Sequence, residues 1–382
     1  MEKEKRIEFI KMIPLNGNNP IKDLFGFFEG LKNKEYPEFL YKNKSLSEIP
    51  VFCYHYISVA EFEAHLQHLE KNGYTTLTAD EFYHAKRNVR GDLIRSAVLT
   101  FDDGDSGFYE VVFPLLKKYG MKAVNFIMPG WVGKKGILTW EQIQEMHKCG
   151  LVDFQSHSMH HPAIFTSAKV IDFYHPNIKA MQNWNMPVYQ SNAIDRFGEK
   201  PLLGSPIFEF HSRFSEHPRF LPDEKVQQAC HQLVEENGGT AFFADRSWRE
   251  KLMNRLNDYQ QNGANAGRFE SYDEQVAEIR TELEESKQMI EKRLAGKKVN
   301  HFACPWNITS ALTQQLLAEV GYKTSFVGIK DVPQPDDLPE ELLTVKRISG
   351  DFVLCLPGEG RQSFIKVIFL KIFRRITKGA TY

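Results

Sequence analysis

The chain has 382 residues, enough for one large domain or two ordinary ones. Hydrophobic residues make up 42% of it and aromatic residues 13%, so a large core can form and global disorder is excluded. The 48 lysines and arginines nearly cancel the 49 acidic residues, which leaves a net charge of −1. A generic nucleic-acid binder is therefore not expected, because such proteins carry a basic surplus.

Five cysteines lie far apart and form no C-x-x-C pair, namely Cys53, Cys149, Cys230, Cys304 and Cys355. This pattern predicts neither a zinc knuckle nor a disulfide framework and favours a reducing compartment. The charged N-terminus is not followed by the apolar segment of a secretory signal. No apolar run reaches the roughly 20 residues that span a bilayer. We therefore expect a soluble cytoplasmic protein.

Strands and helices are predicted to alternate through most of the chain after residue 45. Short β-rich runs predict strands at 50–57, 74–77, 96–101, 122–128 and 152–156. Helical spacing predicts helices around 62–69, 109–119 and 140–148, each closed by a glycine. This alternation is typical of a parallel α/β sheet or barrel.

The alternation breaks at about 172–268, where prolines and glycines are scattered without clean periodicity, and we interpret this segment as an insertion. It returns with a long amphipathic helix at 270–294, a strand at 299–303, a helix at 310–320 and a strand at 323–327. The predicted organisation is an N-terminal appendage at 1–45 with a short helix at 21–31, a barrel at 46–355 that contains the insertion, and a basic amphipathic tail at 356–382.

Two adjacent carboxylates stand directly after the strand at 96–101, in Thr100-Phe101-Asp102-Asp103-Gly104. In parallel α/β folds, catalytic groups gather at the carboxyl ends of strands. Because side chains alternate along extended backbone, Asp102 and Asp103 point in different directions, so one can bind a metal while the other faces substrate. An ordinary strand-end turn is the alternative.

Three histidines follow the strand at 152–156, in Ser156-His157-Ser158-Met159-His160-His161-Pro162. One helical turn would put His157 and His161 on the same face, and His157 with His160 is the competing pair. Two histidines with one carboxylate commonly bind zinc and also bind other divalent metals. Exposed loop histidines are the alternative. A third strand end, Phe302-Ala303-Cys304-Pro305-Trp306-Asn307, is an ordinary turn when taken alone.

Together and in this order, the three motifs resemble those of the polysaccharide deacetylases, the carbohydrate esterases with a NodB-homology domain. The resemblance covers about 50–350 and includes Tyr54-His55, Gly73-Tyr74, TFDDG at 100–104, H-S-x-x-H at 157–161 and FACPW at 302–306. Within the family, the sequence of residues 285–305 most resembles the branch that acts on poly-N-acetylglucosamine. The resemblance implies a distorted (β/α) barrel with a large insertion.

The resemblance also implies a metal-dependent hydrolase that removes N-acetyl groups from an amino-sugar glycan. Asp103, His157 and His161 would hold a divalent metal, with zinc preferred, and Asp102 would be the catalytic base. The backbone N–H of Trp306 would help to hold the oxyanion. The residues expected to contact the carbohydrate are Tyr54, His55, Pro305 and Trp306.

Three features depart from the family pattern. Ala303 and Asn307 stand where many members have arginine and glycine, and Ala303 matches the poly-N-acetylglucosamine branch better. Arg347 is open as a substitute partner for Asp102, although a solvated charge at a strand edge is the favoured interpretation. No histidine follows His301, where the family usually supplies its general acid. The groups left for that role are Asp102, water, or a histidine of the insertion, which are His175, His211 and His217.

The C-terminal segment 364–378 predicts an amphipathic helix with several basic residues. We expect it to pack on the barrel with its cations outward, and the alternative is an interfacial helix on the inner face of an anionic membrane. Two other functions stay open on the same scaffold. One is a catalytically silent glycan-binding protein, and the other is a metal-dependent amidase of small non-sugar amides.

Overall fold

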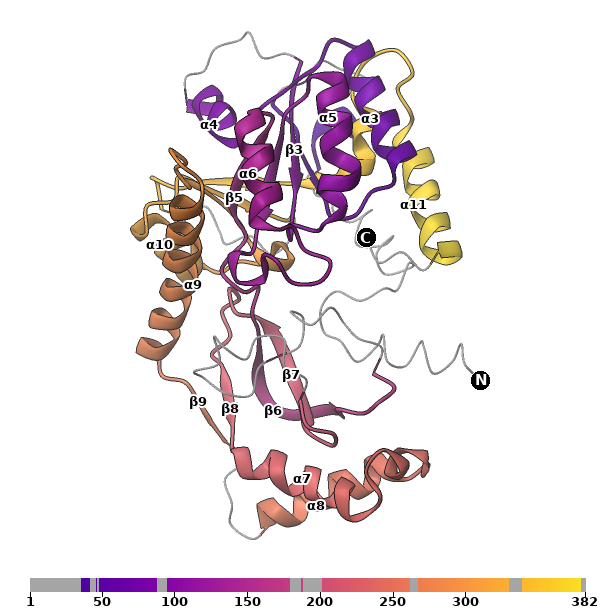
Figure 1. The fold of residues 1–382 in the computed structure, drawn as a ribbon, viewed down its shortest axis with the longest axis vertical. Helices are drawn as coiled ribbons and strands as arrows, with labels where there is room; N and C mark the ends of the chain where they lie inside the picture. Colours follow the sequence, from indigo (N-terminus) through magenta and orange to yellow (C-terminus); the bar gives the residue numbers. More distant parts are fainter. Residues whose placement is uncertain are drawn as a thin grey trace. The chain divides into compact units, whose positions relative to one another are not determined.

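The computed structural model describes residues 36–41, 46, 48–87, 95–178, 187, 201–261, 267–329 and 339–378. The helix predicted at 21–31, and most of the appendage predicted at 1–45, lie outside the described residues. The chain divides into two compact units (Figure 1). The smaller is built on His160–Ile279, and the larger on Asn19–Met159 with Arg280–Tyr382.

The larger unit is built on a nine-stranded sheet in the order β12-β11-β10-β5-β4-β3-β1-β13, with β2 beside β3, and every pairing is parallel. The strands are β1 Val51–Tyr54, β2 Thr75–Thr76, β3 Ser96–Phe101, β4 Ala123–Ile127, β5 Val152–Ser156, β10 His301–Ala303, β11 Thr324–Val327, β12 Leu343–Lys346 and β13 Ile348–Ser349. The strands predicted from short β-rich runs are thus confirmed to within a few residues. The two-residue β13 and the half-exposed β12 were not predicted.

Helices flank this sheet, and their ends follow from local sequence. They are α3 Val59–Lys71, α4 Ala79–Arg87, α5 Phe113–Tyr119, α6 Trp140–Cys149, α10 Ala311–Glu319 and α11 Phe364–Lys378. Ser58 caps α3, and Thr139 with Gln142 forms a capping box on α6. Gly120 ends α5 in the left-handed conformation, with φ 61°. In Figure 1, α3, α5 and α11 lie on one flank of the sheet and α10 on the opposite flank.

A single residue, Arg347, separates β12 from β13, although these strands stand at opposite ends of the strand order. β12 pairs with β11 and β13 pairs with β1, so the sheet must curve until its two edges nearly meet. The backbone N–H of Arg347 donates to the carbonyl of Val327 at 2.9 Å at this junction. The predicted distorted (β/α) barrel is confirmed as a nearly closed parallel barrel.

The smaller unit consists of antiparallel strands and packed helices. β6 Ala163–Phe173 pairs with β7 Pro206–Ser212, and β8 Phe220–Pro222 pairs with β9 Gly267–Phe269. α7 Glu224–Glu236 packs on α8 Trp248–Gln261, and α9 Tyr272–Arg293 begins in this unit. The buried Arg213 binds both carboxylate oxygens of Glu270, at 2.6 and 2.8 Å. The predicted insertion at 172–268 lies within this unit and contains regular elements that its sequence pattern did not predict.

Candidate active site

Four segments that carry potential catalytic groups leave the barrel sheet at the carboxyl ends of parallel strands. His55 follows β1, Asp102 and Asp103 follow β3, His157 follows β5, and Pro305 and Trp306 follow β10. These strands lie in one continuous run of the sheet, with only β4 between β3 and β5. Because the strands are parallel, their carboxyl ends meet at one edge of the sheet.

Asp103, His157 and His161 form a group that could hold a metal ion. Each offers one ligand atom, and these atoms all lie within 4.8 Å of one another. Asp103 Oδ1 is 3.4 Å from His157 Nε2. Both histidines are buried and the aspartate is half-buried. Of the two histidine pairs considered from sequence, the one in this group is His157 with His161.

The prediction that one helical turn puts His157 and His161 on the same face is wrong. Residues 157–162 form no helix. Ser158 and His161 have positive φ values of 66° and 57°, and Pro162 disfavours helical backbone at His161. An irregular loop, rather than a helix face, therefore presents the two imidazoles.

His157 is oriented by the third motif. Its Nδ1 lies 2.8 Å from the carbonyl oxygen of Ala303, and because a carbonyl only accepts, Nδ1 carries the hydrogen. In the neutral ring, Nε2 then turns its lone pair toward Asp103, as a metal-binding histidine requires. Burial lowers the pKa of His157, but the negative charges of Asp102 and Asp103 outweigh it and raise that pKa above its usual value.

Asp102 forms a buried ion pair with Arg347. Arg347 Nη1 lies 2.6 Å from Oδ1 of the carboxylate, and Nη2 lies 2.7 Å from Oδ2. Nη2 also donates to the side-chain oxygen of Asn307 at 2.6 Å. The interpretation of Arg347 as a solvated edge charge is therefore wrong, because the barrel closes at this residue and its side chain lies inside. Asn307 takes a structural role at a position where many family members have glycine.

The charge of Arg347 determines the ionisation of Asp102. Burial raises the pKa of this carboxyl group, but the positive charges of Arg347 and His157 and the hydrogen bonds from Arg347 outweigh it. The pKa of Asp102 is therefore below its ordinary value, and the group is a carboxylate at neutral pH.

His55 and Cys53 complete the surroundings of Asp102. His55 Nε2 lies 3.9 Å from Oδ2 of the carboxylate, and the imidazole is partly exposed. The Cys53 thiol donates to the same oxygen at 3.6 Å, and burial raises its pKa, so it stays protonated. Sequence reasoning assigned His55 to substrate contact and sought the general acid elsewhere. The structure places it beside the proposed base.

The other predicted substrate contacts differ in their surroundings. Tyr54 is buried in the core, where its hydroxyl hydrogen-bonds to His65 Nδ1 at 3.0 Å and its ring stacks on Phe101. This position does not support the predicted contact of Tyr54 with substrate. Pro305 is buried and Trp306 is half-buried, and their contact with substrate stays a prediction.

The three histidines considered as stand-in acids have contacts inside the smaller unit. His211 Nδ1 lies 2.7 Å from the Thr166 hydroxyl, and its ring stacks on His217 with centroids 4.4 Å apart. His175 packs on Trp248. These contacts give each of them a structural role in its own unit.

Backbone strain is concentrated in the three motifs. In the described part of the chain, the non-glycine residues with positive φ are Asp103, Ser158, His161, Trp306 and Asn307. Such conformations cost on the order of 1 kcal/mol each and persist where the surrounding structure fixes them, commonly at functional sites. The motifs are thus held in a geometry that local preference alone would not select.

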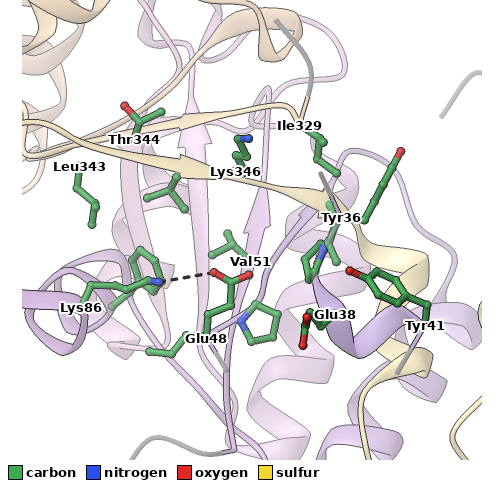
Figure 2. Close-up of a pocket in the computed structure, with 16 residues that line it drawn as sticks. Tyr36, Glu38, Tyr41, Glu48, Val51, Lys86, Ile329, Leu343, Thr344 and Lys346 are labelled. Atoms are coloured by element: carbon green, nitrogen blue, oxygen red, sulfur yellow. Dashed lines mark ion pairs between the residues drawn. The ribbon is translucent and has the colours of Figure 1, made fainter. Parts of the chain in front are cut away.

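A pocket elsewhere in the larger unit contains none of these residues in its lining. It has a volume of about 420 Å³, and Figure 2 shows Glu48 and Lys86 paired across it, with nitrogen and oxygen 3.8 Å apart. The lining comes from the turn at Glu38–Leu40, the start of β1, α4 and β12. It therefore includes the beginning of β1, whereas His55 follows the end of that strand.

Comparisons with known proteins agree with the fold and the motifs. Residues 91–188 match the family described as polysaccharide deacetylase. The Bacillus subtilis protein YxkH, whose name assigns it to the polysaccharide deacetylases, is 37% identical over 128 residues, 31% of this chain and 46% of YxkH. A poly-β-1,6-N-acetyl-D-glucosamine N-deacetylase of Staphylococcus aureus is 32% identical over 125 residues, 31% of this chain and 42% of that protein. The chain thus spans less than half the length of these relatives.

Among solved structures, a de-N-acetylase from Aggregatibacter actinomycetemcomitans aligns with 84% of this chain and 99% of its own, with a TM-score of 0.50 and 17% identity. At that identity the likeness concerns the fold. The barrel is thus similar to that of this de-N-acetylase. The family match spans both TFDDG and H-S-x-x-H, and the resemblance to the polysaccharide deacetylase family is thereby confirmed.

Proposed function

We propose that this protein is a metal-dependent hydrolase that removes N-acetyl groups from an amino-sugar glycan, with Asp102 as the base that activates water. The observation that carries the proposal is the grouping of Asp103, His157 and His161 next to the buried pair of Asp102 and Arg347. The substrate class is supported by the Staphylococcus aureus relative, which is named for N-deacetylation of poly-β-1,6-N-acetyl-D-glucosamine.

The donor set fits a divalent cation. One carboxylate and two imidazoles are a common zinc set that leaves a position open for water or substrate. The Ala303 carbonyl orients His157 with its Nε2 toward that set. A bound cation would polarise the amide carbonyl and lower the pKa of water in the site. We expect zinc at this position.

The protein groups divide the proton transfers between them. Asp102 is ionised and accepts the proton of the attacking water. Arg347 occupies two of the roughly four lone-pair positions of this carboxylate, so acceptor positions remain. The amine leaving group needs a proton, and His55, whose imidazole can donate one, lies close enough to this carboxylate to supply it. The backbone N–H of Trp306 is the proposed donor to the oxyanion.

Metal removal tests the three proposed ligands. We expect a chelator to abolish acetate release from N-acetylglucosamine oligomers and added zinc to restore it. His161→Ala should lose bound metal, measured by mass spectrometry of the purified protein, because it removes one of three donors. His160→Ala is the matched control, since His160 is also buried but is not in the donor group. Metal loss in the control with retention in His161→Ala would contradict the ligand assignment.

The role of His55 as acid is tested by the leaving group. We expect His55→Asn to slow hydrolysis of N-acetyl amides by about 10²- to 10⁴-fold, the usual range for loss of an acid–base group. The same variant should hydrolyse 4-nitrophenyl acetate nearly as fast as wild type, because nitrophenolate leaves without a proton. Equal losses on amide and ester would show that His55 acts in another way.

The position of His55 also bears on the alternative of a silent glycan-binding protein. That alternative was based on the lack of a late histidine, and His55 provides an imidazole beside Asp102. Metal binding without acetate release from any glycan would favour the silent protein. Activity confined to short acyl amides would favour the small-amide amidase.

A further inference from the structure

Charged side chains on the inner side of the C-terminal helix α11 form ion pairs. Arg374 pairs with Asp351 and with Glu61, the latter at 3.0 Å, and Lys371 lies 3.7 Å from Asp351. At the start of the helix, Phe364 is buried and stacks on Phe352. The expectation that these two cations face outward is therefore wrong. The ion pairs fix the rotation of the helix about its axis.

This rotation exposes apolar side chains. The exposed fractions are 63% for Ile365, 68% for Phe369, 44% for Leu370 and 64% for Phe373. Ile365, Phe369 and Phe373 recur every fourth residue and form one stripe along the helix. Lys366, next to Ile365, is exposed as well. Grouped apolar residues on a surface mark an interaction site more often than single ones do.

Helix α11 is connected through its inner side to the segment that carries His55. Arg374 reaches Glu61 in the first turn of α3, and Glu61 accepts a hydrogen bond from the Ser58 hydroxyl at 2.7 Å. Three residues before Ser58 lies His55. The same segment exposes two more large side chains, Tyr56 at 77% and Val59 at 52%.

We propose that the outward face of α11, together with Tyr56 and Val59, docks on the surface of an anionic phospholipid bilayer. Charge favours this partner, because the sequence of the helix has five basic residues and no acidic one. Lys371 and Arg374 are paired on the inner side, and Lys366 is exposed next to the apolar stripe. An apolar stripe beside basic residues is typical of helices that lie in the membrane interface. None of the helices in the described ranges has the length and apolar character needed to cross a bilayer.

Docking in this way would hold the His55 segment close to the membrane surface. If the proposed function holds, the enzyme would bind its N-acetylated glycan at the membrane, for example as the head group of a lipid-linked sugar. This consequence rests on the proposed function. The docking itself depends only on the exposed face and its charge.

Vesicle sedimentation of the full chain tests the docking. We expect wild type to sediment with vesicles that contain phosphatidylglycerol and much less with phosphatidylcholine alone. The double variant Ile365→Ser/Phe369→Ser should bind about tenfold more weakly or worse, since it removes two large apolar groups that insert. Tyr272→Ser, at a residue 65% exposed on α9, is the matched control and should bind as wild type does.

Two results would overturn the docking. One is equal sedimentation of wild type and the double variant. The other is a dimer in analytical ultracentrifugation that the double variant abolishes, because a second copy would then cover the stripe. Acetate release from soluble oligomers should be unchanged in the double variant. Absence of that activity in wild type would count against the proposed function and leave the vesicle result standing.

Discussion

Asp102→Asn is expected to lower acetate release from N-acetylglucosamine oligomers by about 10²- to 10⁴-fold. An amide cannot take the proton of the attacking water, and its NH₂ group would face the guanidinium of Arg347 in place of a charged oxygen. The proposed metal ligands are untouched, so bound metal should be retained. Initial rates and metal content of the same preparation check both expectations.

Asp105→Asn is the matched control for this variant. Asp105 lies in the same strand-end segment but accepts its hydrogen bond from the backbone N–H of Gly107 and is not part of the group formed by Asp103, His157 and His161. We expect it to keep most of the wild-type rate. A fully active Asp102→Asn protein would remove Asp102 from the role of base.

Arg347→Met is expected to lower the free energy of unfolding by about 3–5 kcal/mol, because it leaves the carboxylate of Asp102 buried without its cation. Urea unfolding followed by circular dichroism measures this loss. The double variant Asp102→Asn/Arg347→Met should lose less than the sum of the single variants, since neither charge then remains buried. Additive losses would mean that the two side chains are not coupled.

The pH dependence of this stabilisation has a definite sign. The pKa of Asp102 is lower in the folded protein than its ordinary value of about 3.9. Its contribution is therefore fully present above that ordinary value and is lost as the pH falls through the folded pKa. The stability difference between wild type and Arg347→Met should shrink on acidification below about pH 4.

The barrel could be predicted from sequence because its signals are local. Short apolar runs directly before Asp102 and His157 predict the strands. The polar residues that follow these runs mark the edge of the sheet at which catalytic groups gather. Arg347 was open as a partner of Asp102, but the sequence could not favour it over a solvated edge charge, since it lies 245 residues away and is brought close only by closure of the barrel. The helices α7 and α8 of the smaller unit were missed because the prolines and glycines around them obscured the period.

His55 shows a different limit. Its sequence neighbours place it at the end of a strand, but they do not show which of the other strand ends it faces. That information lies in the order of strands, where β1 stands directly beside β3. The candidates for the acid considered from sequence therefore did not include His55, whereas the topology brings it next to Asp102.

The junction at Arg347 has a consequence for how active molecules arise. Side chains alternate between the two faces of a strand, so a slip of β12 by one residue against β11 would turn the guanidinium to the opposite face. The Asp102 carboxylate would then stand without its counter-charge. Under the proposed function, molecules that assemble in a shifted alignment would be inactive rather than unselective, and turnover would report on correct closure of the barrel.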